Sequence, residues 1–207
     1  MKVNSFISAL SIEGVDELKV DYAAFDVLMQ KQIDENHYRC IEGCGACCNT
    51  PCHHIEASIF EMIPMALELM RIGKAEEFYE LLDQMDTANS VCIIYKPLSE
   101  DGCQGHCTMH DQRPLICRVF GGGNRTSRSG EHELLLCRYL KDYYKDKPEI
   151  ILNVSKEFPV ISEYCSSIRD HNPNLSQQLM PINEALKQAL DLLLTKWFYA
   201  SQVEEGK

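Results

Sequence analysis

Five cysteines lie within a segment of thirteen residues, at the spacing of metal ligands. The segment is Cys40-Ile-Glu-Gly-Cys44-Gly-Ala-Cys47-Cys48-Asn-Thr-Pro-Cys52. Thiolates that are two to four residues apart can face one ion, because a short turn holds them on one side of the backbone. A second group begins about forty residues later, with Cys92, Cys103, Cys107 and Cys117. This density and spacing predict a metalloprotein.

The eleven cysteines are not expected to form a disulfide framework. Residues 1–14 hold one Lys and a short apolar stretch, Phe6–Leu10, which is too short for a secretory leader. We therefore expect a cytoplasmic protein, and the cytosol keeps thiols reduced. An odd number of cysteines also cannot pair completely within one chain. Metal or iron–sulfur ligation is predicted instead.

The spacing of the cysteines does not decide which of them bind the metal. The side chains of adjacent Cys47 and Cys48 diverge in most backbone conformations, so one is expected to bind the metal and the other to serve a second metal or pack in the core. An isolated cysteine more often packs as a small apolar residue. We apply this interpretation to Cys165 and Cys103, and Cys137 stays open.

The charge of the chain excludes some partners. The formal net charge is −11, which argues against nucleic acid because its phosphates repel an acidic surface. No apolar run approaches the roughly eighteen residues of a membrane-spanning helix, so no membrane partner is expected. The segment 112–130 differs, since it lacks Asp and Glu and holds four arginines beside the second cysteine group. They are Arg113, Arg118, Arg125 and Arg128.

Helical periodicity predicts the elements that position these residues. Helices are expected at about 16–36, from 56 or 58 to 71, 75–85, 114–120, 131–145 and 181–200. At Pro64 the second helix either kinks or gives way to a new one. Segment 91–123 is expected to form loops around the metal and 121–130 a glycine-rich loop, while 149–154 could be strand or helix. The predicted fold class is mostly α: a single helical domain folded around a Cys-rich, loop-rich metal centre.

We divide this one domain into three segments. An N-terminal helical segment covers 1–39, a cysteine-cluster metal-binding core covers 40–140, and a C-terminal helical segment packed on the core covers 141–207. A length of 207 residues is consistent with one domain.

The paired cysteine elements resemble a known family. The patterns are Cys40-x3-Cys44-Gly-x-Cys47-Cys48 and, after Cys92, Cys107-x3-Asp111-x-Arg113-Pro114-x2-Cys117-Arg118-x-Phe120. This resembles the YkgJ-type cysteine-cluster family of zinc- or iron-chelating proteins over about Cys40–Phe120. The chain departs from it at Met109-His110, where the family has Ile-Tyr, at Gly121, where it has Pro, and in a first spacing that is one residue longer.

We predict that Cys44, Cys107 and Cys117 bind the metal with Cys47 or Cys48 as the fourth ligand. Cys40 and Cys92 are further candidates, and His110 is a possible extra ligand. Four thiolates suit zinc and an iron–sulfur cluster equally. The surplus of cysteines and the nearby arginines favour the cluster slightly, because a thiolate-bound cluster is net negative.

Arg113 and Arg118 are the candidate cofactor-binding residues. They could bond sulfurs, carboxylates or carbonyls around the centre, or face a cavity and bind an anion; the first role is favoured for Arg118. Arg125 and Arg128, in the expected glycine loop, better suit an external anion.

The predicted function is a cytosolic metal-binding protein in electron transfer, sensing or metal handling. The alternative is an enzyme, an oxidoreductase or a methyltransferase-associated protein as in the flagellin lysine methylases, where a related cluster occurs. No glycine-rich nucleotide fingerprint is present. A metal ion or cluster is the expected partner, and the sequence leaves any protein partner unidentified.

Overall fold

A computed structural model describes residues 10–120 and 122–205, and helices dominate this part of the chain, so the mostly α prediction is confirmed. Residues 6–9 of the N-terminal apolar stretch lie outside the described residues. The α-helices are α2 (Val15–Asn36), α3 (Ile59–Arg71), α4 (Ala75–Gln84), α5 (Leu115–Val119), α6 (Arg138–Tyr143), α7 (Pro148–Glu157), α8 (Ile161–His171), α9 (Pro173–Ser176) and α10 (Ile182–Glu205). Single 3-10 turns lie at Cys52–His54 and His110–Gln112.

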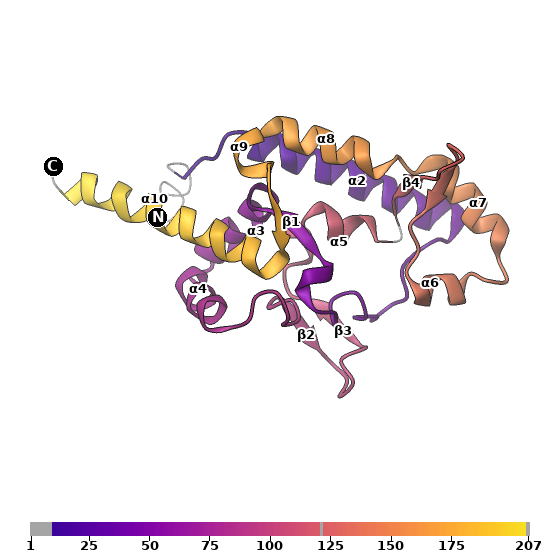
Figure 1. Ribbon diagram of the computed structural model, residues 1–207, viewed down its shortest axis with the longest axis horizontal. Coiled ribbons are helices and arrows are strands. Elements are labelled where there is room, and N and C mark those ends of the chain that lie inside the picture. Colours follow the sequence, from indigo (N-terminus) through magenta and orange to yellow (C-terminus); the bar gives the residue numbers. More distant parts are fainter. Residues whose placement is uncertain (1–9, 121, 206–207) are drawn as a thin grey trace.

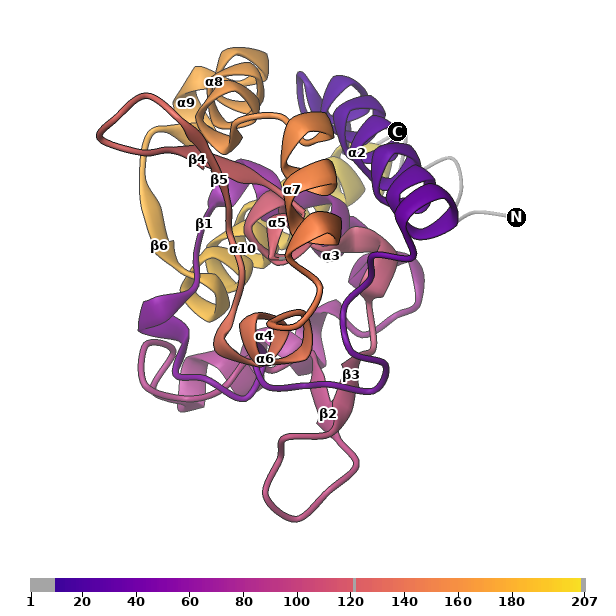
Figure 2. The same ribbon diagram turned by 90° about the vertical axis from the view of Figure 1, so that its right-hand side faces the viewer.

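Short antiparallel strand pairs complete the architecture. The pairs are β1 (Glu56–Ser58) with β6 (Leu179–Pro181), β2 (Tyr95–Pro97) with β3 (Gly105–Cys107), and β4 (Asn124–Thr126) with β5 (His132–Leu134). The β2–β3 hairpin projects from the body at the bottom of Figures 1 and 2.

The main apolar core forms where α10 packs on α3 and α4. Helix α3 contributes Phe60 and Ile63, and α10 contributes Leu186 and Leu190, all buried. Each such side chain stabilises the fold by about 1.5–3 kcal/mol through removal of apolar surface from water. The C-terminal end of α10 extends past this core, at the left of Figure 1.

Helix α3 runs through Pro64 as one helix, which decides between the two alternatives for this proline. Ser58 caps it in a capping box with Glu61, so the helix begins one residue after the strand β1. Gly73 follows the last turn with a φ of +70°, a left-handed conformation that glycine adopts without strain.

A smaller apolar cluster lies near the C-terminal end of α2. Tyr38, Tyr144 and Phe158 form its centre, and the rings of Tyr38 and Tyr144 are 5.1 Å apart. Figure 1 shows α8 alongside α2, and α7 packs beside the C-terminal part of α2.

Segment 122–145 differs from the prediction, and Gly121 lies outside the described residues. The expected helix over 131–145 is wrong, because 132–134 form the strand β5 and only Arg138–Tyr143 are helical. The expected loop is the turn of a hairpin, with Gly130 in the left-handed region at its tip. Segment 149–154 lies in the helix α7.

No helix within the described residues is long and apolar enough to cross a membrane.

Candidate metal centre

The first cysteine segment is a pair of tight turns. The N–H of Cys44 donates to the carbonyl of Ile41 at 3.1 Å, and the N–H of Cys48 donates to the carbonyl of Gly45 at 2.9 Å. Gly43 is the third residue of the first turn and adopts a φ of +71°, a left-handed conformation that glycine takes without strain. These turns bring several thiols to one side of a short stretch of backbone.

Residue 45 must be glycine because a neighbouring aromatic ring leaves no room for a side chain. The Tyr95 side chain packs between Gly45 and Gly105, and a Cβ at either glycine would overlap it. The Tyr95 hydroxyl donates to the carbonyl of Gly102 at 2.6 Å. Glycine at position 45 therefore allows the ring of Tyr95 to lie against the backbone.

The segment that carries Cys92 is held by α10. The buried Asn183 side chain accepts from the N–H of Ile93 at 3.0 Å and donates to the carbonyl of Val91 at 3.0 Å. Cys107 follows in β3, where it pairs with Tyr95 of β2. Sequence reasoning missed Asn183; its only signal is a polar residue at the start of an apolar helix.

Four thiols from three segments lie within electrostatic reach of other members of the set, and we call them the inner thiol group. They are Cys48, Cys92, Cys107 and Cys117. Burial and then the neighbouring Cys92, Cys47 and Cys107 raise the pKa of Cys117 well above its usual value. Burial likewise raises the pKa of Cys92 to about 12. These thiols remain protonated at neutral pH, and a nearby cation would favour their thiolates.

Cys47 and Cys48 do not diverge as expected, because their Sγ atoms are 4.0 Å apart. The hydrogen bond from Cys48 lowers the pKa of Cys47 to about 6, and the same interaction raises that of Cys48. Cys47 is thus the member of the pair that ionises more readily.

A second set of thiols lines an open cavity of about 390 Å³, and we call it the cavity thiol group. It consists of Cys40, Cys44, Cys103 and Cys137. Cys47 also lines this cavity while lying within electrostatic reach of Cys107 and Cys117. It therefore lies between the two groups.

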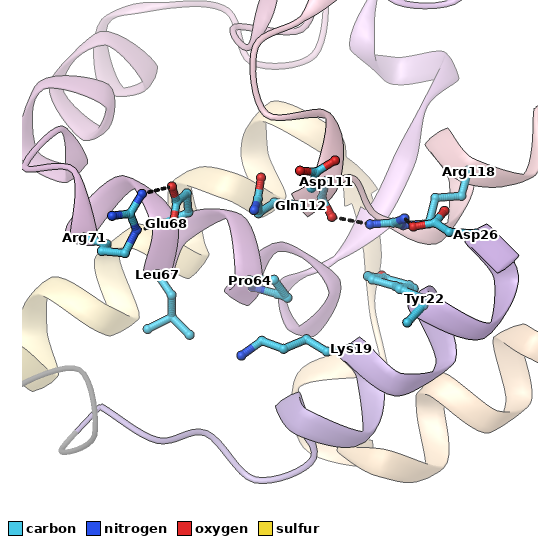
Figure 3. Close-up of a pocket in the computed structure, with 11 residues that line it drawn as sticks. Lys19, Tyr22, Asp26, Pro64, Leu67, Glu68, Arg71, Asp111, Gln112 and Arg118 are labelled. Atoms are coloured by element: carbon cyan, nitrogen blue, oxygen red, sulfur yellow. Dashed lines mark hydrogen bonds and ion pairs between the residues drawn. The ribbon is translucent and has the colours of Figure 1, made fainter. Parts of the chain in front are cut away.

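Arg118 fastens the loop before Cys117 to α2. It is only 5% exposed, and its guanidinium lies 4.5 Å from the centre of the Tyr22 ring. It donates to the carbonyl of Arg113 at 2.8 Å, to the carbonyl of Asp111 and to the carboxylate of Asp26. Figure 3 shows Arg118 with Tyr22, Asp26 and Asp111, which all line a cavity of about 350 Å³.

Arg113 is itself part of the loop before Cys117 and bonds to carbonyls of neighbouring residues. Its guanidinium donates to the carbonyl of His110 at 2.8 Å and to that of Cys117 at 3.2 Å. Cys117 and Cys107 lie within its electrostatic reach. A positive charge thus lies beside the inner thiol group.

A comparison with protein-family models identifies the chain. The model described as "Putative zinc- or iron-chelating domain", labelled CxxCxxCC, matches residues 39–166, more than half of the chain. The chain belongs to this family. No curated protein and no solved structure matches the chain.

The donor set fits the metal chemistry of this cysteine-cluster family. The inner thiol group offers four sulfur donors, which a thiophilic metal prefers, and the Arg113 guanidinium lies beside them. Within residues 10–120 and 122–205, however, no three Cys, His, Asp or Glu side chains are positioned to hold one ion. Binding a metal must therefore draw the three thiol-bearing segments together.

The predicted ligands divide between the two groups. Cys48, Cys92, Cys107 and Cys117 belong to the inner thiol group, and Cys40 and Cys44 belong to the cavity thiol group. The predicted set of Cys44, Cys107 and Cys117 spans both groups and stays a prediction.

Other residues considered in the sequence belong to neither thiol group. The side chain of His110 is 65% exposed and lies 3.9 Å from the Asp111 carboxylate. The Cys165 thiol is exposed, so its interpretation as a core residue is wrong, whereas Cys52 is fully buried in the apolar core. Arg125 lies in β4 and pairs with Glu133 across the hairpin at 2.9 Å.

Proposed function

We propose that this chain binds an iron–sulfur cluster or zinc through the inner thiol group. The observation that carries the proposal is the gathering of four partly buried thiols from three separate segments of a cysteine-cluster family member. Zinc bound there would crosslink the segments, and an iron–sulfur cluster would supply an electron-accepting centre. The chain's residues provide the ligands and hold the segments in place.

The lean towards iron–sulfur is supported by the Arg113 charge. A cluster with several thiolates is net negative, and the Arg113 guanidinium lies within electrostatic reach of Cys107 and Cys117. Arg118 supports the centre through the loop, because it bonds two carbonyls of the loop before Cys117 and the Asp26 carboxylate of α2. Both arginines thus act on the position and charge of the centre.

The role that follows is electron transfer, metal sensing or metal handling in the cytoplasm. An enzyme is the second candidate, and the cavity beside Cys47 favours it, because about 390 Å³ accommodates a small substrate next to the thiols. In an enzyme, turnover or a change in the absorption spectrum of the centre would occur only after a substrate is added. In a carrier or sensor, the spectrum would change on addition of metal or reductant alone.

Purification under anaerobic conditions, with metal and sulfide analysis and an absorption spectrum, tests the proposal. Iron with an equal amount of sulfide and a brown colour indicates a cluster, and a colourless protein with stoichiometric zinc indicates a zinc site. The variant Cys92→Ser/Cys117→Ser should lose this metal. Cys165→Ser is the matched control and should retain it. A protein that contains neither metal and takes up neither on reconstitution would contradict the proposal.

A further inference from the structure

We propose that the cavity of about 350 Å³ lined by α2, α3 and segment 111–118 binds a small zwitterion, an α-amino acid with an aliphatic side chain. This is the cavity drawn in Figure 3, and its described lining contains no cysteine. Its volume falls within the range of about 300–1,000 Å³ that is typical of small-molecule sites. The site is separate from both thiol groups and does not rest on the proposed function.

Two of the cations that line the cavity are already neutralised within the chain. The Arg71 guanidinium contacts both carboxylate oxygens of Glu68, at 2.6 and 2.5 Å. Arg118 bonds the Asp26 carboxylate, and its side chain is only 2% exposed. Figure 3 shows these two pairs apart from each other in the cavity wall. They hold the shape of the wall, and ligand recognition is left to other groups.

Lys19 and Gln112 offer hydrogen-bond donors that the chain leaves free. The Lys19 ammonium contacts only the exposed Asp16 carboxylate, at 3.5 Å, which is a weak contact. The side-chain amide of Gln112 makes no hydrogen bond to any residue of 10–120 and 122–205. Both side chains line the cavity, one from α2 and the other from the turn before Arg113. Together they can bind a carboxylate.

Asp26 and Asp111 offer acceptors in the same cavity. Arg118 occupies Oδ2 of Asp26, and Oδ1 has no partner in the part of the chain that the structure describes. The Asp111 side chain is 91% exposed, and its contact with His110 is long, at 3.9 Å. Neither carboxylate lies within ion-pair distance of Lys19. Together they can bind an ammonium group.

Free groups of both signs around one cavity select a ligand that carries both charges. The ligand's carboxylate would accept hydrogen bonds from Lys19 and Gln112, and its ammonium group would donate to Asp26 and Asp111. A ligand with only a negative charge would be repelled by the two carboxylates, and one with only a positive charge would be repelled by Lys19.

The remainder of the lining is apolar and selects the side chain of the ligand. Pro64 and Leu67 of α3 and Ala23 of α2 contribute it, and Pro64 is buried. Figure 3 shows Pro64 and Leu67 within the same wall as the charged groups. An aliphatic side chain placed against them would be removed from water, which favours binding. A leucine-like amino acid therefore fits this wall better than glutamate or glycine.

Calorimetric titration of the full-length, reduced protein with L-leucine tests the proposal. We expect saturable binding. Isocaproate is leucine without its ammonium group, and isopentylamine is leucine without its carboxylate. Each should bind about tenfold more weakly or less, because charged hydrogen bonds are lost. Absence of binding by L-leucine, L-isoleucine, L-valine and L-methionine, or equal binding of isocaproate or isopentylamine, would overturn the proposal.

Surface variants test which residues bind the ligand. Lys19→Met and Asp111→Asn should each weaken the binding of L-leucine by about tenfold, since each removes one charge from the cavity. Lys31→Met is the matched control on α2, because the Lys31 ammonium pairs with Glu157 outside the cavity, and it should bind as wild type does. Wild-type affinity in both cavity variants, or an equal loss in Lys31→Met, would contradict the assignment.

Hydrogen exchange on the wild-type protein locates the ligand without any variant. L-leucine should slow amide exchange in 110–118, and exchange in α6 should stay unchanged. Slowing in α6 alone would place the ligand in the thiol-lined cavity and overturn the proposal. The metal content is measured separately, so a protein that binds L-leucine but no metal would contradict the proposed function and leave this site standing.

Discussion

Glu61 and Leu115 are joined by a buried hydrogen bond that connects the start of α3 to the start of α5. The Glu61 Oε1 atom accepts from the N–H of Leu115 at 3.1 Å, and Oε2 accepts from the N–H and Oγ of Ser58 at 3.1 and 3.0 Å. Leu115 lies two residues before Cys117. The capping box of α3 therefore also positions a thiol of the inner thiol group.

Replacing this carboxylate should destabilise the fold. In Glu61→Gln one acceptor oxygen becomes an NH2 group, so a buried donor at Ser58 or Leu115 loses its partner. We expect the free energy of unfolding in urea to fall by about 1–3 kcal/mol. Glu68→Gln on the same helix is the control, because its pair with the exposed Arg71 should contribute less than about 1 kcal/mol. Equal losses in the two variants would contradict the special position of Glu61.

The same carboxyl group should make stability depend on pH. Burial raises the pKa of Glu61 above its ordinary value of 4.5, so the folded protein holds this proton more tightly than the unfolded chain. Its contribution is complete below about pH 4.5 and is lost as the pH rises through the higher folded pKa. The free energy of unfolding of wild type relative to Glu61→Gln should therefore fall as pH rises through this window. A difference that rises with pH would reverse the sign and contradict the assignment.

The long helices were predictable because their apolar residues recur on one face. Periodicity identified α2, α3, α4 and α10, and in α2, α3 and α10 the buried side chains repeat every three or four residues over several turns. The three-residue strands are too short to show an alternating pattern. In 131–145, Leu135, Tyr139 and Tyr143 are spaced as in a helix, but only the last two lie in α6. Residues 132–134 of this segment form the strand β5 instead, because they pair with β4.

The site was predictable as a set of thiols but not as two groups. Spacing indicates which cysteines are near one another along the chain. Their division depends on long-range contacts: Asn183 holds the segment of Cys92, and Tyr144 joins α6 to the residue before Cys40. Such contacts leave no local pattern, and so Cys103 and Cys137 could not be assigned from the sequence.

A methyl group at Gly45 should disturb the first cysteine segment through Tyr95. The added Cβ would overlap the ring, so Gly45→Ala should lower the free energy of unfolding by about 1–3 kcal/mol, as overpacking does. It should also reduce metal retention. In Gly45→Ala/Tyr95→Ala the overlap is absent, and the loss should be smaller than the sum of the two single losses. Strict additivity in urea denaturation would show that the ring is not the cause.

Metal removal should loosen the thiol-bearing segments and leave the main core folded. The core between α3 and α10 is apolar and needs no metal, whereas 43–49, 91–107 and 113–118 have few buried apolar side chains of their own. Hydrogen exchange after chelation under reducing conditions should therefore quicken in these three segments and stay slow in α3 and α10. Faster exchange throughout α3, or unchanged exchange at 43–49, would contradict this.

Lysine should not be able to take over the structural role of Arg118, although it carries the same charge. Its fork bonds two carbonyls and the Asp26 carboxylate at once and stacks on Tyr22, and a lysine cannot reproduce that planar arrangement. Arg118→Lys should therefore lower the free energy of unfolding by about 1–3 kcal/mol, because buried carbonyls lose charged hydrogen-bond donors. It should also speed the loss of bound metal to a chelator, since the loop before Cys117 is no longer held to α2.

Arg125→Lys is the matched control, because Arg125 pairs with Glu133 on the surface, where such a pair contributes at most about 1 kcal/mol. Urea denaturation and the rate of metal loss should separate the two variants. Arg118→Lys with wild-type stability and metal release would show that the positive charge alone suffices, and that the fork does not position Cys117.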